Sequence, residues 1–266
     1  ALYKHYNVGI LDSYFPEADF FTEFERFDRH LDKLKRKGTP VDYVSICSPN
    51  YLHDSHIRYA LRYGAHAICE KPIVLNPWNL EALQVLEQET GKKVYTILQL
   101  RHHPSIIALR EKIKAGSPDQ MYTIDLKYIT SRGNWYHSSW KGDHSKSGGI
   151  ATNIGIHFFN MLIWIFGDVK ESTVTELSDQ TASGRLSLKQ ANVNWSLSID
   201  YNTLPEAVKR AGKRTYRSLT MGGEEIEFSD GFTDLHTISY QEILNGRGFG
   251  VREAVPSVAL VYQIRN

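Results

Sequence analysis

The stretch "VDYVSICSPNYLHDSHIRYALRYGAHAICEKP", residues 41–72, decides the fold. It begins with the apolar run "VDYVSIC" (41–47), which predicts a buried strand that ends at "SPN". Residues 53–63 have a helical pattern that stops at Gly64, and "AHAIC" (65–69) predicts the next strand. A strand, a helix and a second buried strand in this order predict a parallel βαβ unit.

The flanking segments continue the same alternation. Apolar residues recur at helical spacing from Phe20 to Gly38, a second helix is expected from Pro77 to Thr90, and "KVYTILQL" (93–100) predicts a further strand. The predicted fold class is therefore α/β, with a doubly wound parallel sheet. Because crossovers in such sheets are right-handed, the strand ends should open on the same edge, at Ser48, Glu70 and Gln99.

The second half of the chain has a different pattern. "YTIDLKYIT" (122–130) and "VNWSLSID" (193–200) alternate, and "RSLTMGGEEIEF" (217–228) predicts a hairpin that turns at Gly222-Gly223. We expect an α+β domain with an open, mainly antiparallel sheet and helices on one face. Its apolar side chains, which include Val193, Trp195 and Leu197, are expected to face a partner subunit, so an oligomer is expected.

Composition excludes several classes of protein. Hydrophobic residues make up 41% and the net charge is +1, so nothing indicates nucleic acid or an anionic membrane as a partner. The longest apolar run, residues 158–166, is too short for a membrane span. Cys47 and Cys69 are expected to be reduced thiols in a cytoplasmic protein, and no metal-binding pattern occurs.

Two groups of candidate site residues follow the first strands. Ser48-Pro49-Asn50 and His53 occupy a strand-to-helix turn of the kind that supports a nucleotide, although capping explains Asn50 and His53 equally well. Lys71 follows the next strand beside Glu70. It is either a base or fixed cation at the mouth of a cleft, or a surface lysine paired with Glu70.

A third group is "SGGIATNIGIHFFNML", residues 147–162. Gly148 and Gly149 would let a ligand approach the start of a helix closely. Asn153 and His157 are four residues apart and share a helix face, on which Gly155 leaves room for a partner. Both a binding site and a satisfied core histidine are compatible with this pattern.

A fourth group is the loop "SRGNWYHSSWKGDHSKSGG" (131–149), in which cations alternate with aromatic side chains. Such a mixture suits a sugar with an anionic attachment, because the aromatic rings stack and the cations bind charge. The candidates here are Arg132, Trp135, Tyr136, Trp140, Lys141 and Lys146 and, as further anion ligands from the basic segment 212–217, Lys213, Arg214 and Arg217.

Taken together, these motifs resemble the Gfo/Idh/MocA oxidoreductases. The resemblance rests on Ser48-Pro49-Asn50, His53, Gly64 and Glu70-Lys71-Pro72, followed by Gly148-Gly149, Asn153, Gly155 and His157. Within that family, segments such as "EKPIVLNPWNLEAL" and "GEEIEFSDGFTDLHTISYQEIL" are most similar to members that act on UDP-N-acetyl-2-amino-2-deoxyglucuronate in lipopolysaccharide O-antigen biosynthesis.

The resemblance implies a Rossmann domain over residues 1–101 and an α+β domain for substrate binding and oligomerisation over 102–266. It implies NAD as cofactor, a UDP-linked amino-uronic acid as substrate and a homo-oligomer, with a tetramer favoured. The residues expected at the cofactor are Ser48, Pro49, Asn50, His53, Glu70, Lys71, Gln99 and Arg101. Those expected at the substrate are Lys71, Arg132, Trp135, Tyr136, Asn153, His157 and Arg214.

The sequence departs from the family pattern in two places. Asparagine stands at position 153, where the family usually has aspartate, and a neutral amide cannot act as a base. The family's glycine-rich turn GxGxxG and its strand do not occur, and we expect that they precede Ala1 in the natural chain. Tyr3 or Lys4 then falls where an acid often binds the adenosine ribose, so these residues do not decide between NAD and NADP.

The expected reaction is oxidation of the sugar C3 hydroxyl to a ketone. The catalytic residues are expected to be Lys71, His157 and Asn153, and the sequence leaves open whether Lys71 or His157 takes the proton. Two alternatives remain. One is a family member that acts on a free sugar or cyclitol, and the other is a catalytically silent NAD or sugar sensor with the same fold.

Overall fold

The stretch 41–72 folds as a parallel βαβ unit in the computed structural model, which describes residues 2–3, 14–226 and 234–266. In the described part, three strands form a parallel sheet in the order β3-β4-β5, with bounds Tyr43–Ile46, His66–Cys69 and Val94–Thr96. The last strand is shorter than expected, because residues 99–102 turn into the 3₁₀ helix η2 (Gln99–His102).

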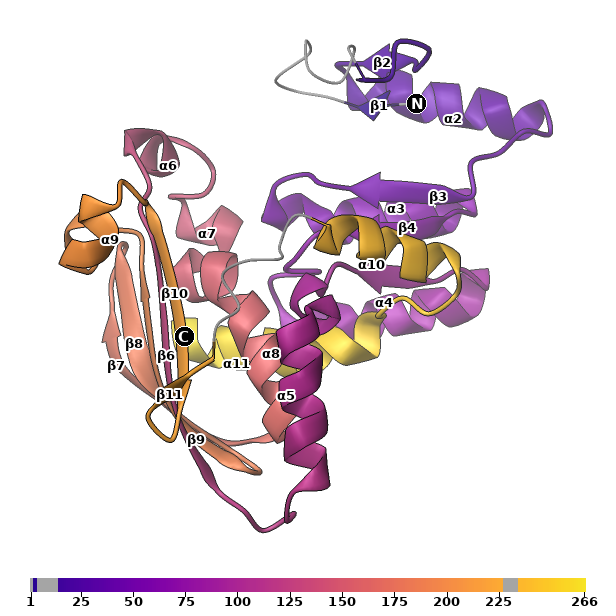
Figure 1. The fold of residues 1–266 in the computed structure, drawn as a ribbon. Coiled ribbons are helices and arrows are strands. Elements are labelled where there is room, and N and C mark those ends of the chain that lie inside the picture. The colour runs from indigo at the N-terminus through magenta and orange to yellow at the C-terminus, as the bar shows by residue number, and fades with distance from the viewer. Residues whose placement is uncertain (1, 4–13, 227–233) are drawn as a thin grey trace.

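Helices connect these strands as the sequence predicts. The helices α3 (His53–Tyr63) and α4 (Pro77–Thr90) end at Gly64 and Gly91, both of which adopt left-handed backbone angles. The short 3₁₀ helix η1 (Asn50–Leu52) precedes α3. Upstream, α2 (Phe24–Arg36) follows a short parallel pair, β1 (Leu2–Tyr3) and β2 (Phe20–Phe21), at the top of Figure 1.

The second half of the chain builds a larger sheet. Among the described residues it has six strands in the order β11-β10-β6-β9-β8-β7. Most neighbours are antiparallel, but β6 and β9 are parallel, so the sheet is mixed and mainly antiparallel. The strand bounds are β6 Tyr122–Thr130, β7 Val169–Leu177, β8 Thr181–Leu188, β9 Ala191–Ser198, β10 Thr215–Met221 and β11 Glu224–Glu225.

The predicted hairpin at Gly222-Gly223 is confirmed. Met221 of β10 pairs with Glu224 of β11, so the two glycines form a two-residue turn with positive φ angles of 61° and 88°. The expected end of the second arm, residues 227–228, lies outside the described residues.

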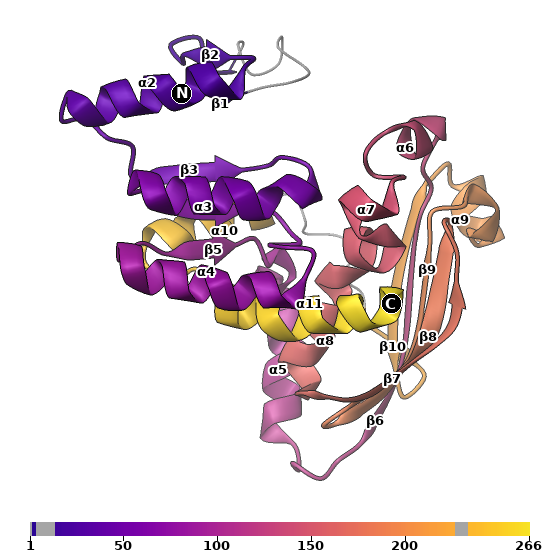
Figure 2. The same ribbon diagram turned by 180° about the vertical axis from the view of Figure 1, so that it is seen from behind.

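Helices between the two sheets form the core of the molecule (Figures 1 and 2). The long central helix α8 (Ile156–Phe166) packs against α5 (Pro104–Ala115) and against the inner face of the large sheet, where Phe159 contacts Trp195 edge to face at 5.2 Å. Shorter helices precede α8, namely α6 (Asn134–Ser138), α7 (His144–Ser147) and a π-helical turn, η3 (Ala151–Gly155). The 3₁₀ helix η4 (Tyr201–Thr203) and α9 (Glu206–Arg210) lie beyond β9.

This packing contradicts the expectation that Val193, Trp195 and Leu197 face a partner subunit. All three side chains are at most 2% exposed, because they pack against helices of their own chain. The alternating residues that face outward from the same strand, such as Asn192 and Asn194, are polar. The period of two in the sequence identified the two faces of β9, but it could not identify what covers the apolar one.

The C-terminal helices return to the parallel sheet. The helix α11 (Val251–Arg265) contacts both α4 and α8, and Gly250 bridges to Tyr95 of β5. The helix α10 (Leu235–Leu244) buries Ile243 against Ile68 and Ile97. The core is thus continuous across residue 101, and the division into domains at that point stays a prediction.

The helical residues His144–Phe166 together are long and apolar enough to cross a membrane by length and composition alone. In the structure 89% of their most apolar window is buried inside the protein, as in the core helix of a globular domain.

Replacement of Gly184 by alanine tests the packing of the large sheet. A Cβ at Gly184 in β8 would overlap the carbonyl oxygen of Thr173 and lie 2.7 Å from the Trp195 ring. Because backbone and a buried ring cannot move aside easily, Gly184→Ala should lower the free energy of unfolding by about 1–3 kcal/mol. Urea denaturation measures this change.

Gly250→Ala is the matched control, because a Cβ there would meet its nearest atom at 3.4 Å, an ordinary contact. Equal stability of Gly184→Ala and the wild-type protein would contradict the packing described for β7, β8 and β9.

Candidate active site

Side chains from both halves of the chain line a cavity of about 220 Å³ beside α8. It lies where the carboxyl ends of β4 and β5 meet the π-helical turn and the large sheet, which is where sites of open parallel sheets are expected. The lining residues are Lys71, Gln99, Leu100, Tyr128, Arg132, Tyr136, Lys141, Asn153, Ile154, His157, Phe158 and Arg217. Six of the residues expected at the cofactor or the substrate are among them, together with Lys141 and Arg217 from the basic segments.

Lys71 connects the two halves of the site. It follows β4, and its Nζ donates a hydrogen bond of 2.7 Å to the carbonyl oxygen of Asn153. Asn153 lies in the π-helical turn, a geometry that is rare in proteins and frequent at functional sites. Burial lowers the pKa of Lys71 to about 8, against the opposing charge of Glu70 and with the help of nearby Lys141 and Arg132.

Asn153 and His157 face the cavity from the same side of the helix, as their spacing predicts. The Asn153 amide donates a 2.8 Å hydrogen bond to the Tyr136 hydroxyl oxygen, which leaves the hydroxyl proton of Tyr136 available to a ligand. Burial lowers the pKa of His157 well below its usual value, and the charge of Lys71 adds to the effect. His157 is therefore a neutral imidazole at neutral pH.

Positive charge gathers at this cavity, although the whole chain carries a net charge of only +1. Lys71, Arg132, Lys141 and Arg217 line it, and no aspartate or glutamate is among the described lining residues. Arg217 of β10 lies over the ring of Tyr128, its partner in β6, at 5.5 Å. A cavity with this lining attracts a ligand that carries more than one negative charge.

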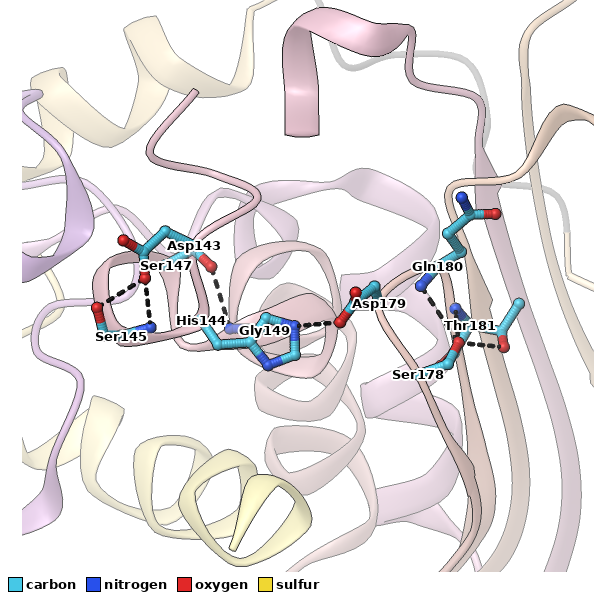
Figure 3. A network of polar contacts seen from close by, with 9 residues as sticks. All are labelled: Asp143, His144, Ser145, Ser147, Gly149, Ser178, Asp179, Gln180 and Thr181. Atoms are coloured by element: carbon cyan, nitrogen blue, oxygen red, sulfur yellow. Dashed lines mark hydrogen bonds and ion pairs between the residues drawn. The ribbon is translucent and has the colours of Figure 1, made fainter. Parts of the chain in front are cut away.

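The loop that carries Arg132, Tyr136 and Lys141 is fixed at its far end by polar contacts (Figure 3). Asp143 caps α7 by accepting a hydrogen bond from the Ser145 amide at 2.9 Å. The next residue, His144, lies 3.1 Å from the carboxylate of Asp179 in the turn between β7 and β8. These contacts connect the loop to the edge of the large sheet, although an exposed pair of this kind contributes little stability.

The residues of the first motif support the site rather than line the cavity. The buried ring of His53 has its nitrogens 2.6 Å from the Pro72 carbonyl oxygen and 2.8 Å from that of Ser48, so it connects the ends of β4 and β3. The Asn50 amide donates to the Ser147 carbonyl at 2.9 Å, and Ser48 bonds to His56. Contacts of Ser48, Pro49, Asn50 and His53 with a cofactor stay predictions.

Glu70 and Arg101 also point to partners outside the cavity. Glu70 lies 3.2 Å from His236 of α10. The buried guanidinium of Arg101 donates to the Asn160 side chain at 2.8 Å and to the Glu253 carbonyl at 3.2 Å. The structure thus does not bring Arg101 to the cavity, because groups of α8 and α11 accept hydrogen bonds from its side chain. The sequence could not predict that these two helices pack beside Arg101.

Within the basic segments some candidate side chains line the cavity and others do not, a difference that the sequence could not show. Trp135 is 52% exposed beside Arg132, and the exposed Arg214 precedes β10, so neither lines the cavity. Arg217, three residues later, does line it. Tyr128 was not predicted at all, although pairing of β6 with β10 sets it beside Arg217.

Gly148 and Gly155 of the third motif serve packing rather than ligand approach. A Cβ at Gly155 would lie 2.6 Å from Leu197 and 2.9 Å from the ring of Phe159. A Cβ at Gly148, whose φ is +79°, would lie within 3.0 Å of Leu75, Thr152 and Arg265. The room that the sequence indicated at these positions is filled by the protein's own side chains.

The residues at the strand ends fit one end of a dinucleotide. The Oε1 atom of Gln99, in the cavity wall, is buried and has no hydrogen-bond partner among the described residues, so it can accept from an amide such as that of nicotinamide. Lys4 and the Tyr3 side chain lie outside the described residues. Within the described part, no group of three His, Cys, Asp or Glu side chains could hold a metal ion.

Solved structures show the same architecture over nearly the whole chain. The WlbA (WbpB) dehydrogenase of Thermus thermophilus is 49% identical with a TM-score of 0.95, over 99% of this chain and 85% of that one. That protein was crystallised with NAD and α-ketoglutarate, and with NAD and UDP-GlcNAcA. The predicted α/β fold with a second, mainly antiparallel sheet is thereby confirmed.

Curated relatives match over shorter segments. D-glucoside 3-dehydrogenase of Escherichia coli is 27% identical over 126 residues, and inositol 2-dehydrogenase of Rhizobium meliloti is 31% identical over 141. These segments span 47% and 53% of this chain, but only 36% and 41% of the relatives' own lengths.

Two family models cover most of the chain. Residues 4–98 match the NAD-binding Rossmann fold of an oxidoreductase family, and residues 110–197 match the C-terminal alpha/beta domain of the same family. The chain belongs to the Gfo/Idh/MocA family of oxidoreductases.

Proposed function

We propose that the protein is an NAD-dependent dehydrogenase that oxidises the C3 hydroxyl of UDP-N-acetyl-2-amino-2-deoxyglucuronate to the 3-keto sugar. The observation that carries the proposal is the cavity in which Lys71 and His157 lie beside three further cationic side chains, with no acid among the described lining residues. The Thermus thermophilus relative, crystallised with NAD and UDP-GlcNAcA, supports the same substrate.

Binding follows from the charges and the size of the site. The substrate has a sugar carboxylate and a diphosphate, and the guanidinium groups of Arg132 and Arg217 suit such anions because they can donate two parallel hydrogen bonds. A cavity of about 220 Å³ is smaller than the roughly 300–1,000 Å³ of typical ligand sites, so it suits the sugar end of the molecule.

For the chemistry, we assign Lys71 as the base that takes the proton of the C3 hydroxyl. With a pKa of about 8, roughly one tenth of Lys71 is neutral at pH 7, and its Nζ is oriented by the Asn153 carbonyl. The neutral His157 is a weak base, but it can donate a hydrogen bond to the sugar oxygen. Bound NAD supplies the acceptor for the hydride that leaves C3, with Gln99 at the nicotinamide amide.

The setting that we propose is surface-polysaccharide biosynthesis of the O-antigen type, in the cytoplasm. Free Cys47 and Cys69 suit a reducing compartment. A homo-oligomer, with a tetramer favoured, also remains part of the proposal. Since the apolar side chains of β9 are covered, any partner subunit would contact the polar outer face of the large sheet or another surface.

The test of the function is turnover by the full-length protein with NAD, followed by the absorbance of NADH. UDP-GlcNAcA should be oxidised, whereas UDP-GlcNAc, which lacks the carboxylate, should be oxidised far more slowly. Oxidation of free glucose or inositol in preference to UDP-GlcNAcA would support the alternative substrates instead. Tight binding of NAD and UDP-GlcNAcA without turnover would indicate a sensor.

A second candidate ligand is α-ketoglutarate, with which the Thermus thermophilus relative was crystallised. This dicarboxylate suits the same four cations, and its 2-oxo group can take up a hydride and a proton to give 2-hydroxyglutarate, which regenerates NAD. We expect α-ketoglutarate to oxidise NADH in the presence of the protein and to compete with UDP-GlcNAcA. Simultaneous binding of both ligands, measured by calorimetry, would contradict a shared cavity.

Replacement of Lys71 distinguishes a base from a fixed cation. Lys71→Ala should lower kcat by about 10²–10⁴-fold and abolish the rise of kcat near pH 8 that we expect for the wild-type protein. The rise has this direction because only the neutral lysine, which forms as the pH increases, accepts a proton. Lys71→Arg should be as inactive as Lys71→Ala, because a guanidinium stays charged. High activity of Lys71→Arg would mean that position 71 only supplies positive charge.

Replacement of Arg217 tests recognition of the anion. Arg217→Ala should raise KM for UDP-GlcNAcA by about 10–150-fold, which corresponds to the loss of about 1.5–3 kcal/mol from a charged hydrogen bond. The value of kcat should change much less, since Arg217 is not assigned to the proton transfer. Arg185→Ala, on the exposed side of β8, removes the same charge away from the cavity and should leave KM unchanged. Equal effects of the two substitutions would contradict a local role.

A further inference from the structure

The helix α10 brings His236 to the residue beside the proposed base. His236 Nε2 lies 3.2 Å from the Glu70 carboxylate, across 166 positions of sequence. The Glu70 side chain is 27% exposed and that of His236 is 51% exposed, so solvent screens the attraction between them, which is ionic when His236 is protonated. The cavity lining includes neither residue. The link between this pair and the cavity is Lys71, which follows Glu70 in the chain and interacts with its charge.

Independent contacts hold α10 in place, so the ion pair is not the cause of its position. The Tyr240 hydroxyl lies 2.5 Å from that of Ser45 in β3. One turn further, Ile243 is 2% exposed and packs against Ile68 and Ile97. The packing of α10 therefore places His236 beside Glu70. A substitution of the His236 side chain should leave the contacts of Tyr240 and Ile243 intact.

Glu70, His236 and Lys71 influence one another's charge, and further titratable groups from several elements surround them. Hydrogen bonding and the charge of His236, together with Lys71, lower the pKa of Glu70 against the opposing effect of burial, and Glu70 raises the pKa of His236. In turn, the charge of Glu70 opposes the lowering of the Lys71 pKa by burial. The other titratable or charged groups that face these three are Cys47, His53, Cys69, Arg132, Lys141, His157, Arg217 and Tyr240.

We propose that His236 is a positioning residue for the reaction: it holds and partly neutralises the Glu70 carboxylate, which keeps Lys71 able to accept a proton near neutral pH. This proposal rests on the assignment of Lys71 as the base. Without His236, the uncompensated carboxylate would stabilise the charged form of Lys71, and the repulsion between His236 and Lys71 would also be lost. Both effects favour the protonated lysine, which cannot act as a base.

The test measures the protonation of Lys71 directly. The rate of its acetylation by trace acetic anhydride, followed by peptide mass spectrometry over a range of pH, gives a midpoint without any turnover. His236→Gln should move that midpoint upward by about half a pH unit, less than for a fully buried charge pair. Glu70→Gln should move it downward. The double variant should lie close to Glu70→Gln, because without Glu70 only the weaker direct repulsion between His236 and Lys71 is left to lose.

The pH profile of kcat with UDP-GlcNAcA should shift in the same directions, and His30→Gln provides a control. His30 pairs with Asp19 at 3.4 Å on α2, outside the cavity lining, and its loss should leave the midpoint of Lys71 unchanged. An unchanged midpoint in His236→Gln, or shifts of both single variants in the same direction, would overturn the proposal. Shifted midpoints in a protein that does not oxidise UDP-GlcNAcA would uphold the electrostatic role and reject the proposed function.

Discussion

The hydrogen bond from Lys71 Nζ to the Asn153 carbonyl, 2.7 Å long, is the contact on which the site depends. It joins the end of a parallel strand to a π-helical turn some eighty positions away in the sequence. Each partner has its own support. His53 connects the chain after Lys71 to the end of β3, and Asn153 is bonded to Tyr136. An active-site lysine needs such support, because a flexible side chain must be oriented before it can accept a proton efficiently.

Burial and charge together determine what this lysine can do. Its pKa of about 8 results from loss of hydration and from neighbouring cations, opposed by Glu70. The same cations that make Lys71 easier to deprotonate also attract an anionic sugar nucleotide, so binding and activation have one electrostatic origin. The pair of Glu70 and His236 adjusts this balance from outside the cavity. The net charge of +1 for the whole chain does not reveal this cluster of cations, because ligand binding depends on the local distribution of charge.

Much of the fold could be predicted from local patterns. Hydrophobic periodicity and the positions of glycine, both visible in the sequence, predicted the helices at 53–63 and 77–90 and the hairpin at Gly222-Gly223. Contacts between distant segments could not be predicted in this way. Alternation in β9 gave its two faces, but not the helices that cover one of them, and the partners of Arg101 and Glu70 come from α8, α11 and α10. The convergence of Lys71, Gln99, Asn153 and His157 followed from the rule that sites lie at strand ends, together with the family resemblance.

The central claim is that Lys71 lies in the cavity that binds the sugar nucleotide. The most direct measurement is the rate at which acetic anhydride acetylates Lys71 in the full-length protein, with and without saturating UDP-GlcNAcA, compared with exposed Lys112 on α5. The account predicts that UDP-GlcNAcA slows acetylation of Lys71 strongly and leaves Lys112 unaffected. Equal acetylation of Lys71 in the presence and absence of bound UDP-GlcNAcA would contradict it.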